Sequence, residues 1–141
     1  MKIWTVLIVL CSSAAYAADP LANTYWRSYD DENGKLKGIV KLTEVNGTLE
    51  GRIVENYVNV SVCRQCPPPQ TNHPIVGLKI ISGLKPSGSA EYADGQIIEP
   101  KTGKVYRLKA TLKSPNQLEL RGFLGISLLG RTQIWERYFP K

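Results

Sequence analysis

The sequence is poor in the side chains from which most catalytic and metal sites are built. Its 141 residues include one histidine, His73, so a site that needs two imidazoles is excluded. Ser-His-Asp catalysis would depend on that histidine, and the Gly-x-Ser-x-Gly motif is absent. The acids Asp30, Asp31 and Glu32 share one expected turn, whereas glycoside hydrolysis needs two carboxylates across a cleft. We therefore expect a protein that is not an enzyme and that carries no metal or other cofactor.

Long apolar runs are also missing, because no stretch approaches the roughly 18 residues of a membrane-spanning helix. Residues 1–17 instead have the pattern of a secretory signal peptide. Lys2 precedes a short apolar stretch over residues 3–10, and Ala15-Tyr16-Ala17 matches a small-x-small cleavage site. We expect cleavage after Ala17 and a periplasmic or secreted protein. A buried N-terminal helix and a lipoprotein anchor at Cys11 are the alternatives, although a bulky leucine before the cysteine disfavours the anchor.

Residues 18–141 are expected to form one all-β domain. Apolar and polar residues alternate with period two, and turn signals such as Asn46-Gly47 separate the alternating segments. The expected strands cover residues 24–29, 36–44, 48–57, 75–84, 91–99, 104–113, 117–124 and 131–138. About eight consecutive strands of this kind favour a closed antiparallel up-and-down barrel, which has no exposed sheet edge. A two-sheet sandwich is the alternative.

Prolines and glycines predict the connections between these strands. Pro86-Ser87-Gly88 is expected to turn the chain after the fourth strand. The long connection over residues 58–74 contains Pro67, Pro68 and Pro69 in succession, which favours an extended polyproline conformation. The apolar connection over residues 125–130 is expected to plug one end of the barrel, with contact to a membrane or a partner as the alternative.

The alternation predicts which side chains point inward. On the seventh expected strand, for example, Leu124 should face inward and Phe123 outward, because charged residues occupy the same face as Phe123. Small residues interrupt the apolar faces, which indicates either a ligand cavity or relief of crowding in a packed barrel. The candidate ligand-binding residues are Ile53, Tyr106, Leu108, Ala110, Leu120 and Gly122.

The cysteine pair and the distribution of positive charge also bear on function. Cys63 and Cys66 are expected to form a structural disulfide in an oxidising compartment, with free thiols, redox catalysis or a zinc site completed by His73 as alternatives. The net charge of +6 is spread along the chain, and an outward stripe of Arg107, Lys109 and Lys113 is expected to be solvated. No nucleic-acid-binding motif with stacking aromatics is present, so we expect no nucleic-acid partner.

Four segments resemble a known bacterial family. They are Asp19-Pro20-Leu21 leading into Tyr25-Trp26, the acidic turn over residues 30–35, the Cys63 to Pro67 segment, and the closing segment from Gly122 to Trp135. Together they resemble domain-of-unknown-function family 2147, small secreted bacterial proteins. The resemblance covers essentially all of residues 18–141 and implies a lipocalin-like (calycin) barrel without an established activity. Carriage of a small hydrophobic ligand is then an expectation from fold analogy.

Lipocalins place a Gly-x-Trp motif on the first strand and an arginine on the last strand, where the arginine packs over the indole and closes one end of the barrel. Here Thr24-Tyr25-Trp26 occupies the position of that motif, with threonine in place of glycine. The resemblance implies barrel closure by Trp26 with Trp135 on the last strand and with Arg131 or Arg137 as the stacking partner.

The sequence therefore predicts a non-enzymatic periplasmic or secreted binding protein that holds a small hydrophobic or amphipathic ligand inside a barrel. The alternative is a structural or interaction protein of the cell envelope, with a fully packed barrel and functional outer loops.

Overall fold

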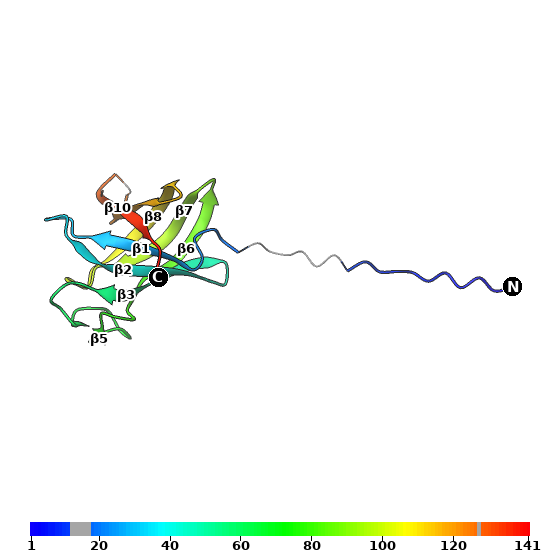
Figure 1. The fold of residues 1–141 in the computed structure, drawn as a ribbon, viewed down its shortest axis with the longest axis horizontal. Helices are drawn as coiled ribbons and strands as arrows, with labels where there is room; N and C mark the ends of the chain where they lie inside the picture. The colour runs from blue at the N-terminus through cyan, green and yellow to red at the C-terminus, as the bar shows by residue number, and fades with distance from the viewer. Residues whose placement is uncertain (12–17, 127) are drawn as a thin grey trace.

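The computed structural model describes residues 1–11, 18–126 and 128–141, and its centre is a closed antiparallel β-barrel. The expected cleavage site at Ala15–Ala17 lies outside the described residues. The barrel strands are β1 (Thr24–Tyr29), β2 (Leu36–Val45), β3 (Thr48–Asn56), β6 (Lys79–Gly88), β7 (Glu91–Ile98), β8 (Val105–Ser114), β9 (Gln117–Phe123) and β10 (Gly130–Tyr138). Each strand pairs with the next one along the chain, and β1 pairs with β10 to close the barrel (Figure 1). The predicted all-β up-and-down barrel is confirmed, and the sandwich alternative is wrong.

The described residues contain no α-helix, and hence no helix long and apolar enough to cross a bilayer. Two short strands, β4 (Val62–Cys63) and β5 (His73–Pro74), form a separate two-stranded sheet inside the long connection between β3 and β6. The sequence did not predict this sheet, because each of its strands is too short to show alternation.

Turn chemistry explains why the hairpin between β2 and β3 could be predicted from the sequence. Asn46 and Gly47 have φ angles of 52° and 79°, which is the left-handed pair that a two-residue hairpin turn requires. This two-residue turn connects β2 directly to β3, and the flanking residues Val45 and Thr48 pair with each other. The Asn-Gly prediction is therefore confirmed.

The fourth predicted strand was placed four residues too early. The observed strand β6 runs through Pro86, which pairs with Tyr92, and the turn follows at Ala90 with a φ of 56°. A turn at residues 86–88 was the wrong expectation. Strand β3 pairs with β6 only as far as Leu84, so Pro86 lies beyond the end of this pairing. The N–H that proline lacks is therefore not needed for a hydrogen bond to β3. Upstream, Ile75 and Leu78 are buried but lie outside the strands, where the N–H of Leu78 donates to the carbonyl of Ile75 at 3.1 Å.

Two other local predictions are wrong. Gln70 N–H donates to the carbonyl of Pro67 at 3.0 Å, so the chain turns across the three prolines and is not an extended polyproline segment. Leu124 is 56% exposed, whereas Phe123 is buried on the outer face under Arg107 and Lys109. Strand β9 ends at Phe123, so the alternation no longer applies to Leu124.

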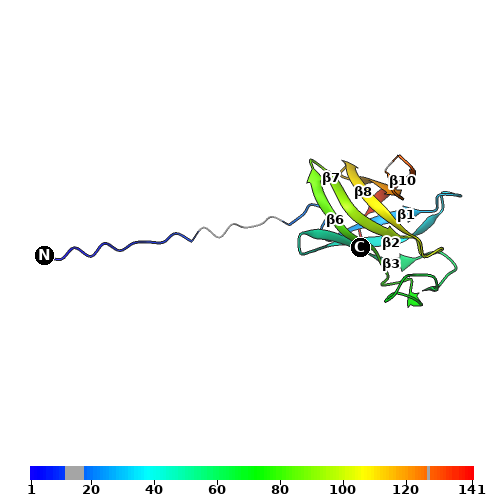
Figure 2. The same ribbon diagram turned by 180° about the vertical axis from the view of Figure 1, so that it is seen from behind.

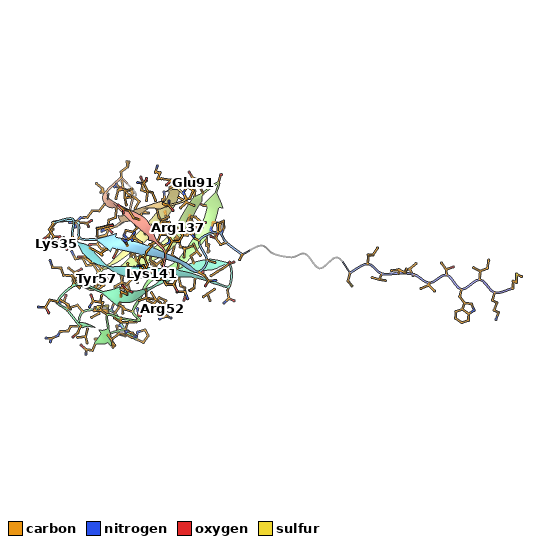
Figure 3. All side chains as sticks on the ribbon, in the orientation of Figure 1. Lys35, Arg52, Tyr57, Glu91, Arg137 and Lys141 are labelled. Atoms are coloured by element: carbon orange, nitrogen blue, oxygen red, sulfur yellow. A yellow bond between two sulfur atoms is a disulfide. The ribbon has the colours of Figure 1, made fainter. Side chains whose placement is uncertain are left out.

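The two ends of the barrel are built differently. Figures 1 and 2 show the β1–β2 turn, the β9–β10 connection and the long β3–β6 connection at one end, and residues 18–23 with the β2–β3 turn at the other. Figure 3 labels Lys35 in the β1–β2 turn at the first end and Glu91 at the start of β7 toward the second. We call the first the open end and the second the closed end.

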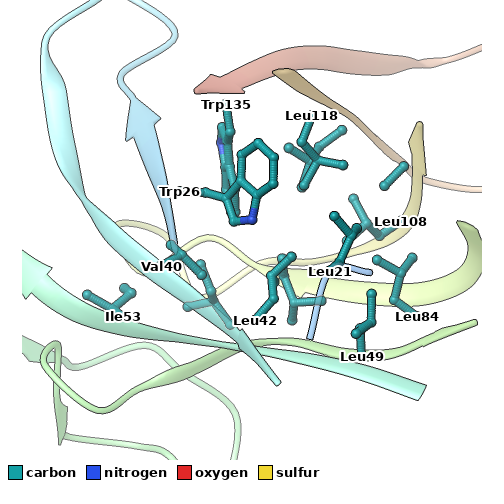
Figure 4. Packing of buried hydrophobic residues seen from close by; sticks show 14 of the residues in the cluster. Leu21, Trp26, Val40, Leu42, Leu49, Ile53, Leu84, Leu108, Leu118 and Trp135 are labelled. Atoms are coloured by element: carbon teal, nitrogen blue, oxygen red, sulfur yellow. The ribbon is translucent and has the colours of Figure 1, made fainter. Parts of the chain in front are cut away.

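Apolar side chains fill the closed end. Figure 4 shows Leu21, which precedes β1, among Leu84, Leu108 and Leu42 in the interior of the barrel. Leu21 is 1% exposed and belongs to the same buried cluster as Trp26 and Leu118. The segment before β1 therefore acts as an apolar plug.

Asp19 holds this plug in place. Its Oδ1 accepts hydrogen bonds from the N–H of Leu21 and from the hydroxyl of Tyr92, both at 2.8 Å. Its own N–H donates to Glu44 Oε2 at 2.9 Å. Burial of Tyr92 raises the pKa of its hydroxyl above the ordinary value, and the bond to Asp19 raises this pKa further.

We expect Tyr92→Phe to lower the free energy of unfolding at neutral pH by about 1 kcal/mol, the usual contribution of one such hydrogen bond. Because the pKa of Tyr92 is raised in the folded state, its contribution is fully present below about pH 10, where tyrosine of the unfolded chain ionises. The contribution falls as the pH rises above that value. Urea unfolding at pH 8 and pH 10.5 should therefore show a larger alkaline loss in the parent than in the phenylalanine variant. Equal losses would contradict the assignment.

Candidate ligand cavity

A cavity of about 360 Å³ opens at the open end of the barrel. Side chains from β3, β6, β7, β8, β9 and β10 form an apolar wall that includes Ile53, Ile80, Ile97, Leu108, Leu120 and Trp135. The mouth is lined by charged side chains, which include Asp30, Asp31, Glu32, Lys37, Glu99 and Lys101. An apolar chamber below a charged rim is suited to a ligand with an apolar body and a polar end.

Most of the candidate ligand-binding residues line this cavity. Ile53, Tyr106, Leu108, Leu120 and Gly122 all contribute to its surface. Ala110 does not line it. This residue is 3% exposed and pairs with Tyr92 and Leu120, one inward position further toward the closed end, where the core is packed.

The interior glycines have two different roles, which correspond to the two interpretations left open by the sequence. A Cβ on Gly51 would lie 3.0 Å from Ile81 Cβ and 3.2 Å from Leu42 Cδ2, so this glycine relieves crowding. A Cβ on Gly122 would lie no closer than 3.6 Å to any neighbour, which is ordinary van der Waals contact. Gly122 lines the cavity, so its missing side chain adds to the open space.

A chain of polar contacts leads from the cavity wall to the mouth. Trp135 Nε1 donates to Gln133 Oε1 at 3.0 Å, and Gln133 Nε2 donates to Asp31 Oδ1 at 2.7 Å. Arg131 Nη1 lies 3.9 Å from Asp31 Oδ2. These contacts hold the β1–β2 turn against the inward face of β10. Asp31 therefore links the turn to the last strand of the barrel.

Gln133 was not among the predicted site residues. It lies two positions from both Arg131 and Trp135 on β10, and all three line the cavity. Because side chains two positions apart on a strand share a face, the inward position of Trp135 predicts that Gln133 also points inward. The hydrogen bond between Gln133 and Asp31 joins residues 102 positions apart, so it cannot be predicted from a local sequence pattern.

The first turn is shaped by its own acid. Asp30 Oδ1 accepts hydrogen bonds from the N–H groups of Glu32 at 2.8 Å and Asn33 at 3.2 Å. These bonds, with that from Glu32 the stronger influence, lower the pKa of Asp30 below its ordinary value. Asp30 is therefore a carboxylate that caps a turn at the mouth.

The predicted closure residues lie at different places. The guanidinium of Arg137 lies 6.0 Å from the centroid of the Trp26 ring, and its Nη1 donates to the Pro115 carbonyl at 3.4 Å. Arg137, and not Arg131, is therefore the arginine over Trp26 at the closed end. Arg131 lies at the mouth, and Trp135 is a buried side chain of the cavity wall.

Thr24 has a structural role in place of the glycine of the Gly-x-Trp pattern. Trp26 Nε1 donates to Thr24 Oγ1 at 2.7 Å, and Thr24 Oγ1 donates to the carbonyl of Leu21 at 2.6 Å. The threonine therefore joins the buried indole to the apolar plug.

Cys63 and Cys66 form a disulfide, as predicted, and both are buried. Cys63 Sγ lies 3.4 Å from the carbonyl oxygen of Pro100 in the β7–β8 turn. In the same turn, Gly103 has a φ of 72°, and a Cβ there would lie 1.8 Å from the carbonyl oxygen of Gln65. Two connections at the open end therefore pack against each other beside the mouth, and glycine is required at this contact.

The predicted plug at residues 125–130 is wrong. Ile126, Leu128 and Leu129 are 60%, 83% and 70% exposed, so they do not enter the barrel. The mouth at this end is bordered instead by the β1–β2 turn and the long β3–β6 connection, which contribute residues to its lining.

The chemistry available at the cavity is limited. Within residues 1–11, 18–126 and 128–141 there is no group of three His, Cys, Asp or Glu side chains placed to hold a metal ion. His73 lies outside the cavity lining, with Nδ1 2.6 Å from the carbonyl oxygen of Pro74. The arrangement can enclose and orient a molecule.

Comparison with known proteins supports the fold assignment. The structure is similar to protein HP1028 from the human pathogen Helicobacter pylori, which is described as belonging to the lipocalin family. The TM-score is 0.73 at 20% sequence identity, and the alignment covers 87% of this chain and 85% of that chain. This likeness shows a lipocalin-like fold. No curated protein matches the sequence.

A family model described as "Uncharacterized protein conserved in bacteria (DUF2147)" matches residues 24–137. The match runs from the first barrel strand into the last, and it therefore includes all of the strands that form the cavity wall. The resemblance inferred from the sequence is confirmed: the chain belongs to this bacterial family.

Proposed function

We propose that this protein is a non-enzymatic binding protein of the periplasm or the extracellular space, which holds a small amphipathic ligand inside its barrel. The observation that carries the proposal is the cavity of about 360 Å³ with an apolar wall and a charged mouth. Small-molecule sites have volumes of about 300–1,000 Å³ and mostly apolar linings. The lipocalin-like fold is compatible with such a role.

The wall would contribute affinity and the rim would contribute orientation. Leu108, Leu120 and Ile53 offer apolar surface to the body of a ligand. Tyr106 lines the same space and would offer its hydroxyl as a hydrogen-bonding group. A polar end would lie among the charged side chains of the mouth, where water remains accessible.

Location outside the cytoplasm rests on two independent features. The signal-peptide pattern of residues 1–17 directs export, and the Cys63–Cys66 disulfide suits an oxidising compartment. The alternative of an envelope protein with a fully packed barrel is less well supported, because that alternative needs a filled interior.

Native mass spectrometry of protein purified after export tests the proposal. We expect an additional mass that is lost after mild organic extraction, and we expect the extracted protein to bind one equivalent of 1-anilinonaphthalene-8-sulfonate with increased fluorescence. A protein that carries no additional mass, does not enhance the probe and shows no xenon binding in the barrel would refute ligand carriage.

A further inference from the structure

The connection between β9 and β10 presents an unusual group of apolar side chains to solvent. Leu124, Ile126, Leu128 and Leu129 are 56%, 60%, 83% and 70% exposed. Single exposed apolar residues are ordinary on protein surfaces, but a cluster within six consecutive residues is not. We call these four residues the apolar loop.

Hydrogen bonds from the neighbouring strands hold the apolar loop in this exposed conformation. Arg107 Nη1 on β8 donates to the Gly125 carbonyl at 3.4 Å, and Arg121 Nη2 on β9 donates to the Leu128 carbonyl at 3.3 Å. The N–H of Leu129 donates to the Ile126 carbonyl at 3.1 Å and closes a turn. These bonds hold the carbonyls of Gly125, Ile126 and Leu128, while the four apolar side chains remain exposed to solvent.

Positive charge lies directly beside the loop. Arg107 and Lys109 extend over the outer side of the Phe123 ring, 5.5 Å and 5.7 Å from its centroid. Among the described residues, neither side chain has a carboxylate within salt-bridge distance. Glu119, the acidic residue of the neighbouring strand β9, is paired with Lys113 at 3.6 Å. The two cations are consequently available to an external anion.

We propose that the apolar loop is a membrane-docking element, which inserts into the surface of an anionic phospholipid bilayer while Arg107 and Lys109 contact the lipid phosphates. Amphipathic elements bind bilayer interfaces by this combination of buried apolar side chains and attraction to anionic headgroups. A nucleic acid would use the cations but would gain nothing from the exposed leucines.

Docking in this way would bring the barrel mouth to the membrane. The loop joins Phe123 to Gly130, and the adjacent residues Gly122 and Arg131 both line the cavity. Figure 1 shows the β9–β10 connection at the same end of the barrel as the β1–β2 turn. In that turn, Asp31 is engaged by Arg131 and Gln133, which reduces its repulsion of an anionic surface. The docking contact itself does not depend on whether the cavity holds a ligand.

Vesicle flotation tests the proposal with protein purified after export, whose N-terminus is verified by mass spectrometry so that the apolar leader is known to be absent. We expect the protein to float with vesicles of mixed phosphatidylglycerol and phosphatidylcholine and much less with phosphatidylcholine alone. Arg107→Gln with Lys109→Gln should weaken binding by about 25-fold, since each cation near an anionic surface contributes roughly fivefold. Leu128→Ser with Leu129→Ser should weaken it by at least about tenfold.

Matched control variants lie away from the loop. Val76→Ser removes an exposed apolar side chain, 55% exposed, from the long connection, and Lys85→Gln removes an exposed cation from β6. Both should bind vesicles as the parent does. These two controls and the leucine variant should have the thermal unfolding midpoint of the parent. The variant without Arg107 and Lys109 loses their contacts with the Phe123 ring, so it should be shown by circular dichroism to be folded at the temperature of the flotation assay.

Three results would overturn the proposal. One is absence of flotation with the anionic vesicles. Another is that the leucine variant and the cation variant bind anionic vesicles as tightly as the parent does. The third is a dimer, seen by analytical ultracentrifugation, that the leucine substitutions dissociate, because the apolar loop would then be an interface between two copies.

Discussion

Replacement of Trp26 by alanine is expected to lower the free energy of unfolding by about 3–5 kcal/mol, the range for truncation of a large buried aromatic side chain. Trp26 is fully buried, and its indole N–H donates to Thr24 Oγ1, which in turn donates to Leu21. The substitution therefore leaves a cavity and also leaves the Thr24 hydroxyl without its donor. Since small domains have a total stability of only about 5–15 kcal/mol, the variant should be marginally folded at 37 °C.

Urea unfolding followed by far-ultraviolet circular dichroism measures this effect. Phe139→Ala is the matched control, because Phe139 directly follows β10 and is 64% exposed. Its ring lies 5.0 Å from the Arg137 guanidinium, and loss of an exposed contact of this kind should change the free energy of unfolding by no more than about 1 kcal/mol. Trp26→Phe should be intermediate, since it retains most of the buried ring but loses the N–H. A Trp26→Ala protein as stable as the parent would contradict the role of this residue in closing the barrel.

Gly122→Leu and Gly51→Leu are expected to have opposite effects on binding and stability. The leucine at position 122 would project into the cavity, where the glycine Cβ position has ordinary contact distances to Tyr106 and Ile97. We expect binding of 1-anilinonaphthalene-8-sulfonate to weaken at least tenfold, or about 1.4 kcal/mol, with little loss of stability. At position 51 the new side chain would collide with Ile81 and Leu42, and overpacking of this kind typically costs about 1–3 kcal/mol of stability.

Fluorescence titration and urea unfolding of both variants separate the two roles. Gly51→Leu should bind the probe as the parent does under conditions in which it is folded, because Gly51 does not line the cavity. The assignment of the cavity would be contradicted if Gly122→Leu bound the probe with unchanged affinity. Retained binding in that variant would place the probe elsewhere on the molecule.

The inward residues of β8 show what the alternation of apolar and polar residues can predict and what it cannot. Alternation along β8 identified Tyr106 and Leu108 as inward residues, and both line the cavity. The same rule placed Ala110 with them, although Ala110 lies in the packed part of the barrel. A period of two specifies the face of a strand, but it does not specify the depth along the barrel axis. That depth depends on the register and tilt of the strands.

The two arginines considered for Trp26 illustrate a second limit. Arg131 and Arg137 lie on the same face of β10, so alternation cannot distinguish them. They lie at opposite ends of one strand, and only the antiparallel pairing of β1 with β10, which places Trp26 opposite Arg137, decides between them. The partnership of Asp31 with Gln133 is of the same kind, because it arises from closure of the barrel.

The sequence by itself determined the all-β class, the up-and-down order, most strand bounds, the Asn46-Gly47 turn and the cysteine pair, because each of these follows from local alternation, turn chemistry or composition. Only the tertiary structure decided that the interior is open near Gly122 and packed near Gly51, that Asp31 lies at the mouth against β10, and that the apolar loop faces solvent. These features depend on distances between segments far apart in the chain, which are set when β1 pairs with β10 and the barrel closes.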